Sequence, residues 1–91
     1  MAIAVLIEFT GITQEQYDSV VADLNVDGKP GPEAIFHVAG PTEGGWRMVE
    51  VWESQEAFEA FTNDKIIPLA QKHGVTQRPK TDIWPVHNML R

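Results

Sequence analysis

The chain has 91 residues, of which 43% are hydrophobic and 22% charged, a composition typical of one globular domain, residues 1–91, with a small core. The formal net charge of -6 disfavours nucleic acid as a partner, because an acidic surface repels phosphate backbones and the few Lys and Arg residues form no cluster. The absence of cysteine excludes disulfides and thiolate metal sites.

Residues 2–9, AIAVLIEF, predict a first strand, because one of its two alternating faces is wholly apolar. The apolar run 2–7 is too short to span a bilayer and lacks the basic start of a signal peptide, so we expect a cytoplasmic protein without a membrane partner. Thr13 and Gln16 then have the spacing of a capping box and predict the start of a helix. Its apolar stripe consists of Tyr17, Val20, Val21 and Leu24.

Residues 25–33, NVDGKPGPE, are rich in Gly and Pro and predict a loop. Residues 34–39, AIFHVA, and 44–54, GGWRMVEVWES, predict two strands of a hairpin joined by the turn 40–45, GPTEGG. Alternate residues of a strand share a face. One face of the second of these strands then carries Trp46, Met48, Glu50 and Trp52, and the other carries Arg47, Val49, Val51 and Glu53.

Ser54 is a good N-cap and predicts the start of a second helix. Because Pro68 cannot lie inside a helix without breaking a hydrogen bond, we expect a break near residues 63–64. A short helix follows, with Pro68 in its opening turn and Gly74 as its C-cap.

Residues 81–90, TDIWPVHNML, predict the last strand, and Pro85 places this strand at an edge of the sheet or at a bulge. The order β-α-β-β-α-β predicts a ferredoxin-like α+β fold, in which a four-stranded antiparallel sheet carries both helices on one face. The other face is left for a second copy of the chain, since pairing is one route by which a small domain gains stability.

The sequence offers two assignments for the faces of residues 44–54. Val49 and Val51 match the apolar face of residues 2–9 and are expected under the helices. The tryptophan face would then be uncovered, and an apolar patch of this size predicts a homodimer interface. A bulge after Gly45 would instead exchange the faces, and the tryptophans would line a ligand-binding cleft between sheet and helices.

The AIAVLIEF opening, the FHVAGPTEGGWRMVEVWES hairpin and the terminal WPVHNML, in this order of elements, resemble small uncharacterised bacterial proteins of the dimeric α+β barrel superfamily. This superfamily includes the antibiotic-biosynthesis monooxygenase-like domains. The resemblance covers nearly the whole chain and implies a homodimeric α+β barrel. Its members include cofactor-independent monooxygenases that act on polycyclic phenols, haem-degrading enzymes, isomerases and proteins of unknown function, and fold alone does not select among them.

The resemblance to the haem-degrading branch is weak, because residues 2–9 lack that branch's asparagine. His73, next to Gly74, is better explained as a cation near a helix C-terminus than as an iron ligand. The monooxygenase branch surrounds an aromatic substrate with Trp, Asn, Tyr and Arg. Residues of these types here are Trp52, Asn88, Tyr17 and Arg47.

The candidate catalytic residues are His37 and His87, because a neutral imidazole can take a proton from a phenol. The candidate ligand-binding residues are Tyr17, Trp46, Glu50, Trp52 and Asn88. Structural roles remain open beside these: His37 at the edge of the core, His87 and Asn88 facing a dimer partner or solvent. Glu50 could act as a base beside the indoles, or pair with Arg47 or Lys80 of the other chain.

The three histidines are scattered and no glycine-rich phosphate loop is present in the right context, so we expect neither a metal nor a cofactor. The leading hypothesis is a cofactor-independent, monooxygenase-like enzyme acting on an aromatic or quinol-like metabolite. One alternative is a non-catalytic dimeric module that binds a small aromatic ligand or a partner. Another is a dimer whose tryptophans only hold its two halves together.

Overall fold

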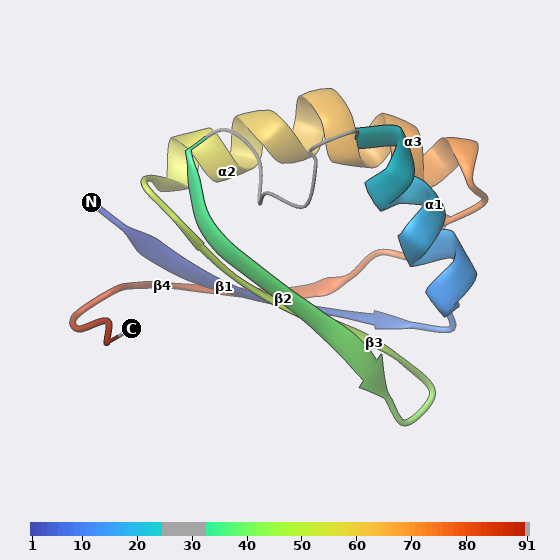
Figure 1. The fold of residues 1–91 in the computed structure, drawn as a ribbon, viewed down its shortest axis with the longest axis horizontal. Helices are drawn as coiled ribbons and strands as arrows, with labels where there is room; N and C mark the ends of the chain where they lie inside the picture. The colour runs from blue at the N-terminus through green and yellow to red at the C-terminus, as the bar shows by residue number, and fades with distance from the viewer. Residues whose placement is uncertain (25–32, 91) are drawn as a thin grey trace.

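Four antiparallel strands form one sheet in the order β2-β3-β1-β4, and the helices lie on one of its faces (Figure 1). The computed structural model describes residues 1–24 and 33–90. Its elements are β1 (Ile3–Thr10), α1 (Gln14–Leu24), β2 (Ala34–Thr42), β3 (Gly45–Trp52), α2 (Gln55–Phe61), the π-helical turn η1 (Thr62–Ile66), α3 (Ile67–Lys72) and β4 (Lys80–Pro85). The predicted ferredoxin-like α+β fold is confirmed. The predicted loop 25–33 lies, except for Glu33, outside the described residues.

The predicted helix starts are confirmed by their hydrogen bonds. Thr13 Oγ1 accepts from the Gln16 N–H at 3.1 Å, and Gln16 Oε1 accepts from the Thr13 N–H at 3.0 Å, which completes a capping box for α1. Ser54 Oγ accepts from the Ala57 N–H at 3.1 Å and caps α2. Because both starts are fixed by local side chains, the helices begin where the sequence predicts.

The predicted break near residues 63–64 is instead a change of helix type. The chain continues from α2 through η1 into α3 as one run of helix (Figure 1), and the Ile67 N–H reaches back five residues to the Thr62 carbonyl. A proline ring clashes with the carbonyl four residues before it, here that of residue 64, and the wider π turn relieves this clash. As predicted, Pro68 lies in the first turn of α3, and Gly74 follows that helix with φ +80°.

Asp23 links the end of α1 to the end of α3. Its Oδ2 lies 2.7 Å from Nε2 of His73, the C-cap of α3, and 3.0 Å from Lys72 Nζ. The hydrogen bond from His73, and then that from Lys72, hold the pKa of Asp23 below its usual range. The link lies at the solvent-exposed surface, where ion pairs contribute little to stability, and it joins only the ends of the two helices.

Two strand boundaries differ from the prediction. β2 runs to Thr42, so the turn is the residue pair Glu43–Gly44, with Gly44 at φ +76°, and not the whole of residues 40–45. β4 ends at Pro85 and does not reach residue 90, because proline cannot continue the ladder. β4 lies at an edge of the sheet, as predicted.

The prediction that the tryptophan face is uncovered is wrong. β1 pairs with β3 so that Ile3 lies opposite Trp52 and Phe9 opposite Trp46, and cross-strand partners share a face. Both tryptophans therefore lie under the helices, in two clusters: Ile3, Val5, Trp52 and Phe58, and Ile12, Trp46 and Val75. No bulge after Gly45 is needed, since this pairing is continuous; the irregularity lies in β2, between Ala34 and Phe36.

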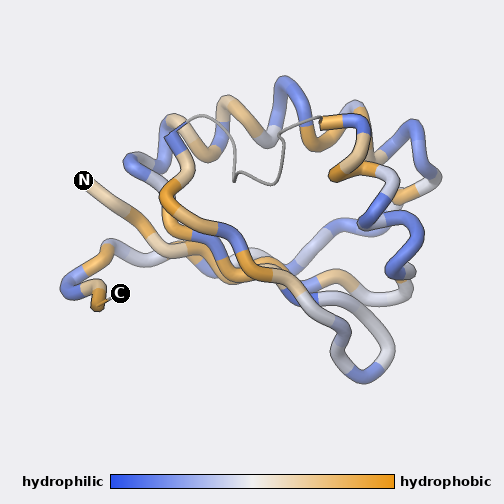
Figure 2. Tube along the Cα trace, viewed as in Figure 1, coloured by the Kyte–Doolittle hydropathy of each residue, from blue (hydrophilic) through white to orange (hydrophobic). Residues whose placement is uncertain are grey.

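The face of the sheet without helices is apolar. It carries Val49 and Val51, which the sequence predicts to lie under the helices. One row across it consists of Trp84, Ala4, Val51 and Phe36, and the next of Asp82, Leu6, Val49 and Val38. Phe36, Val38 and Trp84 are 39%, 55% and 46% exposed. Apolar residues run along the middle of the strands, whereas they alternate with hydrophilic ones along the helices (Figure 2). Across residues 1–24 and 33–90, every helix is too short or too polar to cross a membrane.

Candidate functional site

A chain of hydrogen bonds joins four side chains between the sheet and the helices. The Tyr17 hydroxyl, from α1, lies 2.6 Å from Nε2 of His37, on β2. Nδ1 of His37 lies 2.6 Å from Oε2 of Glu50, on β3. The other carboxylate oxygen of Glu50 accepts a hydrogen bond from Trp52 Nε1 at 2.9 Å. We call these four side chains the relay.

The hairpin register builds most of the relay. His37 is the cross-strand partner of Glu50, and Trp52 lies two residues further along β3 on the same face. Tyr17 comes from the first turns of α1, whose start is fixed by the capping box at Thr13. Three elements therefore contribute to the relay, and each side chain is held by the backbone ladder or by a helix cap.

The relay fixes which nitrogen of His37 carries the proton. A carboxylate only accepts hydrogen bonds, so the Nδ1–H of His37 donates to Glu50. In the neutral imidazole, Nε2 is then the acceptor for the Tyr17 hydroxyl. Hydroxyl, imidazole and carboxylate follow one another in the same order in serine hydrolases, where they move the hydroxyl proton to the imidazole. The geometry therefore suits proton transfer from Tyr17 to His37, with Glu50 stabilising the imidazolium.

Tyr17 itself stays protonated near neutral pH. Burial raises the pKa of Tyr17 above its usual 10.0, and the negative charges of Glu50 and Asp18 raise it further. Its oxygen can accept a proton from a substrate only while it passes its own proton to His37. At neutral pH the protonated Tyr17 can therefore pass a proton on to His37, but it cannot serve as a phenolate base.

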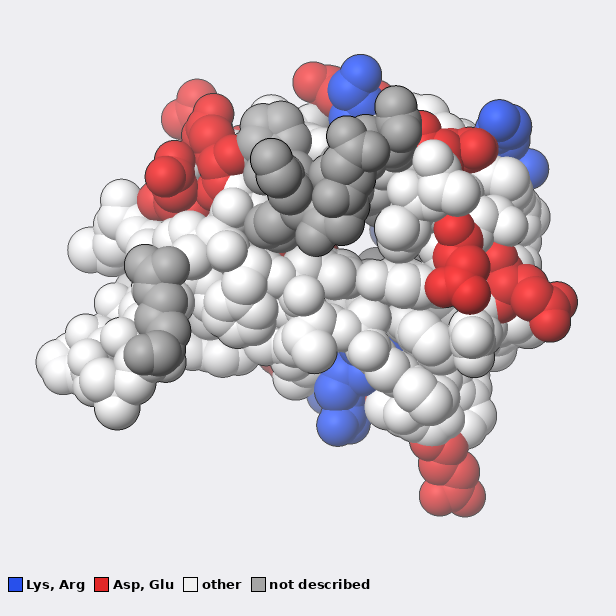
Figure 3. Space-filling model, viewed as in Figure 1, with Lys and Arg blue, Asp and Glu red and all other residues white. Residues whose placement is uncertain are grey.

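The relay is mostly buried, but some of its side-chain surface remains accessible to solvent. The side chains of His37 and Glu50 are 26% and 13% exposed. The space-filling view is hollowed between the helix layer and the sheet (Figure 3). Arg47, the alternative partner considered for Glu50, lies on the opposite face of the sheet and donates to Glu8 Oε2 at 2.9 Å.

Trp46 lies beside the relay. Its ring centroid is 5.1 Å from that of Tyr17, at an interplanar angle of 36°. Tyr17 in turn stacks on His37, with centroids 5.9 Å apart and an angle of 10°. Tyr17, His37, Glu50, Trp52 and Trp46, five of the seven candidate residues, therefore lie together.

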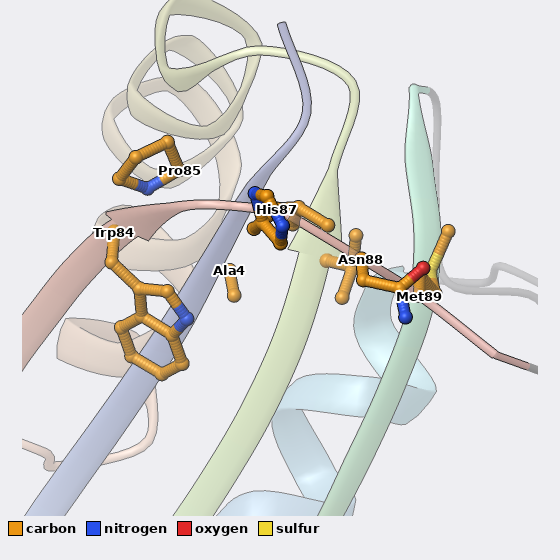
Figure 4. Close-up of a pocket in the computed structure, with 8 residues that line it drawn as sticks. Ala4, Trp84, Pro85, His87, Asn88 and Met89 are labelled. Carbon is orange, nitrogen blue, oxygen red and sulfur yellow. The ribbon is translucent and has the colours of Figure 1, made fainter.

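His87 and Asn88 lie elsewhere. The segment after Pro85 crosses the uncovered face of the sheet and borders a cavity of about 370 Å³ there (Figure 4). Its lining includes Ala4, Val51, Trp84, His87, Asn88 and Met89. The two candidate histidines, His37 and His87, therefore belong to opposite faces of the sheet and cannot share one substrate.

Every member of the relay is among the residues predicted from the sequence, but the bond between His37 and Glu50 is not predicted. Because Glu50 was assigned to the uncovered face, it was not connected with His37. Within residues 1–24 and 33–90, no three His, Asp or Glu side chains are grouped so that they could hold a metal ion.

No model of a protein family matches the chain, and no curated protein is similar enough to count as a relative. Solved structures share its fold. The cofactor-independent oxygenase SnoaB from Streptomyces nogalater is 16% identical, with a TM-score of 0.68 over 98% of this chain and 96% of that one. A dimeric ferredoxin-like protein of unknown function from Thermobifida fusca is 15% identical, with a TM-score of 0.65 over 94% and 92%.

A putative antibiotic biosynthesis monooxygenase from Chloroflexus aurantiacus is 18% identical, with a TM-score of 0.60 over 96% of both chains. The structures that this chain is similar to thus include antibiotic-biosynthesis-monooxygenase-like proteins of the ferredoxin fold, as the resemblance in the sequence indicates. At such identities the likeness establishes the fold alone.

Proposed function

We propose that this protein is a cofactor-independent, monooxygenase-like enzyme that acts on an aromatic or quinol-like metabolite, and that it works as a homodimer. The observation that carries the proposal is the relay, a hydroxyl, an imidazole and a carboxylate in hydrogen-bonded series under the helices. The similarity to SnoaB, described as a cofactor-independent oxygenase, supports it.

The proton path follows from the relay. A phenol that reaches the Tyr17 hydroxyl donates its proton to the Tyr17 oxygen while the Tyr17 proton moves to Nε2 of His37. Glu50 stabilises the resulting imidazolium, and Trp52 holds Glu50 in place by its Nε1–H. The substrate becomes an electron-rich phenolate in a site that is largely shielded from water.

The oxygen step then needs no cofactor, because the phenolate itself reduces dioxygen. One electron passes to O₂, and the two radicals combine to a hydroperoxide at a ring carbon. His37 returns its proton to the outer oxygen, which completes the hydroperoxide. The C–H bond at that ring carbon then breaks to form the second C=O bond as the O–O bond breaks, and the ring proton and the leaving hydroxide form water, which gives the quinone. One oxygen atom enters the product and the other leaves as water, so atoms and electrons balance.

The uncovered face supports the homodimer. Phe36, Val38 and Trp84 expose apolar surface there, as an interface core would. One of the similar structures is described as dimeric. A second copy packed on this face would leave the relay, on the opposite face, free for substrate.

Oxygen uptake with a naphthol as substrate tests the proposal. The wild type is expected to consume one O₂ per naphthoquinone formed. His37→Gln keeps a hydrogen-bonding side chain but no base, so we expect kcat to fall by about 10²–10⁴-fold with a smaller change in naphthol binding.

His73→Gln is the matched control, since His73 lies at the end of α3 and is expected to leave turnover within about twofold of the wild type. His87→Gln decides between the two candidate bases. If His87→Gln stops turnover and His37→Gln does not, the site is the cavity on the uncovered face. If naphthols bind and neither oxygen nor naphthol is consumed, the protein is a ligand-binding module.

A further inference from the structure

The cavity on the uncovered face of the sheet owes its shape to one small residue. The row across this face consists of Trp84, Ala4, Val51 and Phe36, so the methyl group of Ala4 lies between larger neighbours. Ala4 and Val51 line the cavity from the sheet, together with the indole of Trp84, and the segment after Pro85 borders it (Figure 4). Its volume of about 370 Å³ falls within the range of roughly 300–1,000 Å³ that is typical of small-molecule sites.

The apolar lining of this cavity suits a flat aromatic ring. Trp84 is the largest side chain of the row, and yet it is 46% exposed. Trp84 and Met89 lie at opposite ends of the lining (Figure 4). Indoles and thioethers both make favourable contacts with aromatic rings. A planar ligand over Ala4 would therefore cover exposed indole surface and contact the thioether at its other end.

The polar side chains of the lining suit a carboxylate. His87 and Asn88 are exposed, and both border the cavity. An imidazole and an amide each offer an N–H donor, and a carboxylate, which only accepts, can take a hydrogen bond from both. Among the described residues that line the cavity none is Asp or Glu, so an anion meets no like charge there, although the net charge of the chain is -6.

We propose that this cavity binds an aromatic carboxylate, with its ring against Trp84 and its carboxylate at His87 and Asn88. The site is separate from the relay, which lies on the opposite face of the sheet. It is also compatible with a second copy on the uncovered face. Packed sheets lie about 10 Å apart, and the segment after Pro85 takes up that space, so the partner would rest on the segment and leave the cavity beneath it.

The three tryptophans of the chain report which face a ligand contacts, because Trp46 and Trp52 lie under the helices and Trp84 lies on the other face. In protein with ¹⁵N-labelled tryptophan, the indole signal that is absent from Trp84→Phe belongs to Trp84. We expect 2-naphthoate to shift this signal and to leave the other two in place. It should bind about tenfold more tightly than its uncharged methyl ester, and the double variant His87→Ala/Asn88→Ala should lose that preference.

Ala4→Leu fills the cavity and should weaken naphthoate binding by about tenfold or more, while unchanged Trp46 and Trp52 signals show that the fold is kept. Ala22→Leu, at an exposed alanine of α1, is the matched control and should bind as the wild type does. Three outcomes would overturn the inference: no binding to the wild type, a shift of the Trp46 or Trp52 signal instead, or undiminished binding to Ala4→Leu. His37→Gln should stop oxygen uptake with naphthol and keep naphthoate binding, so the proposed enzyme and this site fail in different measurements.

Discussion

Tyr17 is the only tyrosine of the chain, so its ionisation can be followed directly by the ultraviolet absorbance of tyrosinate. We expect a titration midpoint above 10.0, because burial and the charges of Glu50 and Asp18 disfavour the phenolate. Glu50→Gln removes one of these charges and should lower the midpoint. A midpoint at the value of free tyrosine would contradict the buried position of Tyr17.

The same shift predicts how stability depends on pH. The pKa of Tyr17 is higher in the folded chain than in the unfolded one, so the folded chain holds this proton more tightly. The contribution to the free energy of unfolding is complete below about pH 10, and it is lost as the pH rises through the folded pKa. Urea unfolding across the alkaline range should show this loss in the wild type and not in Tyr17→Phe.

At the scale of elements, the pairing of β2 with β3 can be predicted from the sequence, whereas the pairing of β1 with β3 cannot. In a two-residue hairpin, residues equally distant from the turn are partners, so a turn at Glu43–Gly44 places His37 opposite Glu50. The pairing of His37 with Glu50 therefore follows from a two-residue turn, but not from the six-residue turn predicted at residues 40–45. The pairing of β1 with β3 joins segments far apart in the chain, so no local pattern indicated which face the helices cover.

Gly45 begins β3 in close contact with β1. A Cβ at this position would overlap the carbonyl oxygen of Phe9, whereas one at Gly40 would meet nothing within 4 Å. We expect Gly45→Ala to lower the free energy of unfolding by about 1–3 kcal/mol, because backbone must move, and Gly40→Ala to leave it nearly unchanged. Urea denaturation of the two variants checks this. Equal free energies of unfolding for Gly45→Ala and Gly40→Ala would contradict this prediction, because they would mean that β1 and β3 move apart at Gly45 without loss of stability.

At the scale of the whole molecule, the two faces of the sheet have separate roles. One face carries the relay under the helices, and the other carries the exposed side chains of Phe36, Val38 and Trp84, which we propose to be covered by a second copy of the chain. Val38→Glu should therefore convert a dimer to a monomer, because it buries a charge in the proposed interface. Light scattering on a gel-filtration column measures the mass directly.

Val21→Glu is the matched control for Val38→Glu. Val21 is also an exposed valine, but it lies on α1, away from the uncovered face, and its substitution should leave the dimer intact. A wild type that elutes with the mass of one chain would overturn the homodimer. It would leave the proton relay untouched, because all four of its members come from a single chain.

Trp52 is part of both the hydrophobic core and the relay. It is 2% exposed and packs against Phe58 and Phe61, so it fills the core. The same indole orients Glu50. A substitution of Trp52 would therefore have two effects: it would change the packing of the core, and it would remove the hydrogen bond that orients Glu50. A lineage in which Phe replaces this tryptophan would keep an aromatic ring in the core and lose the hydrogen bond that holds Glu50, so the fold could persist after the relay is gone.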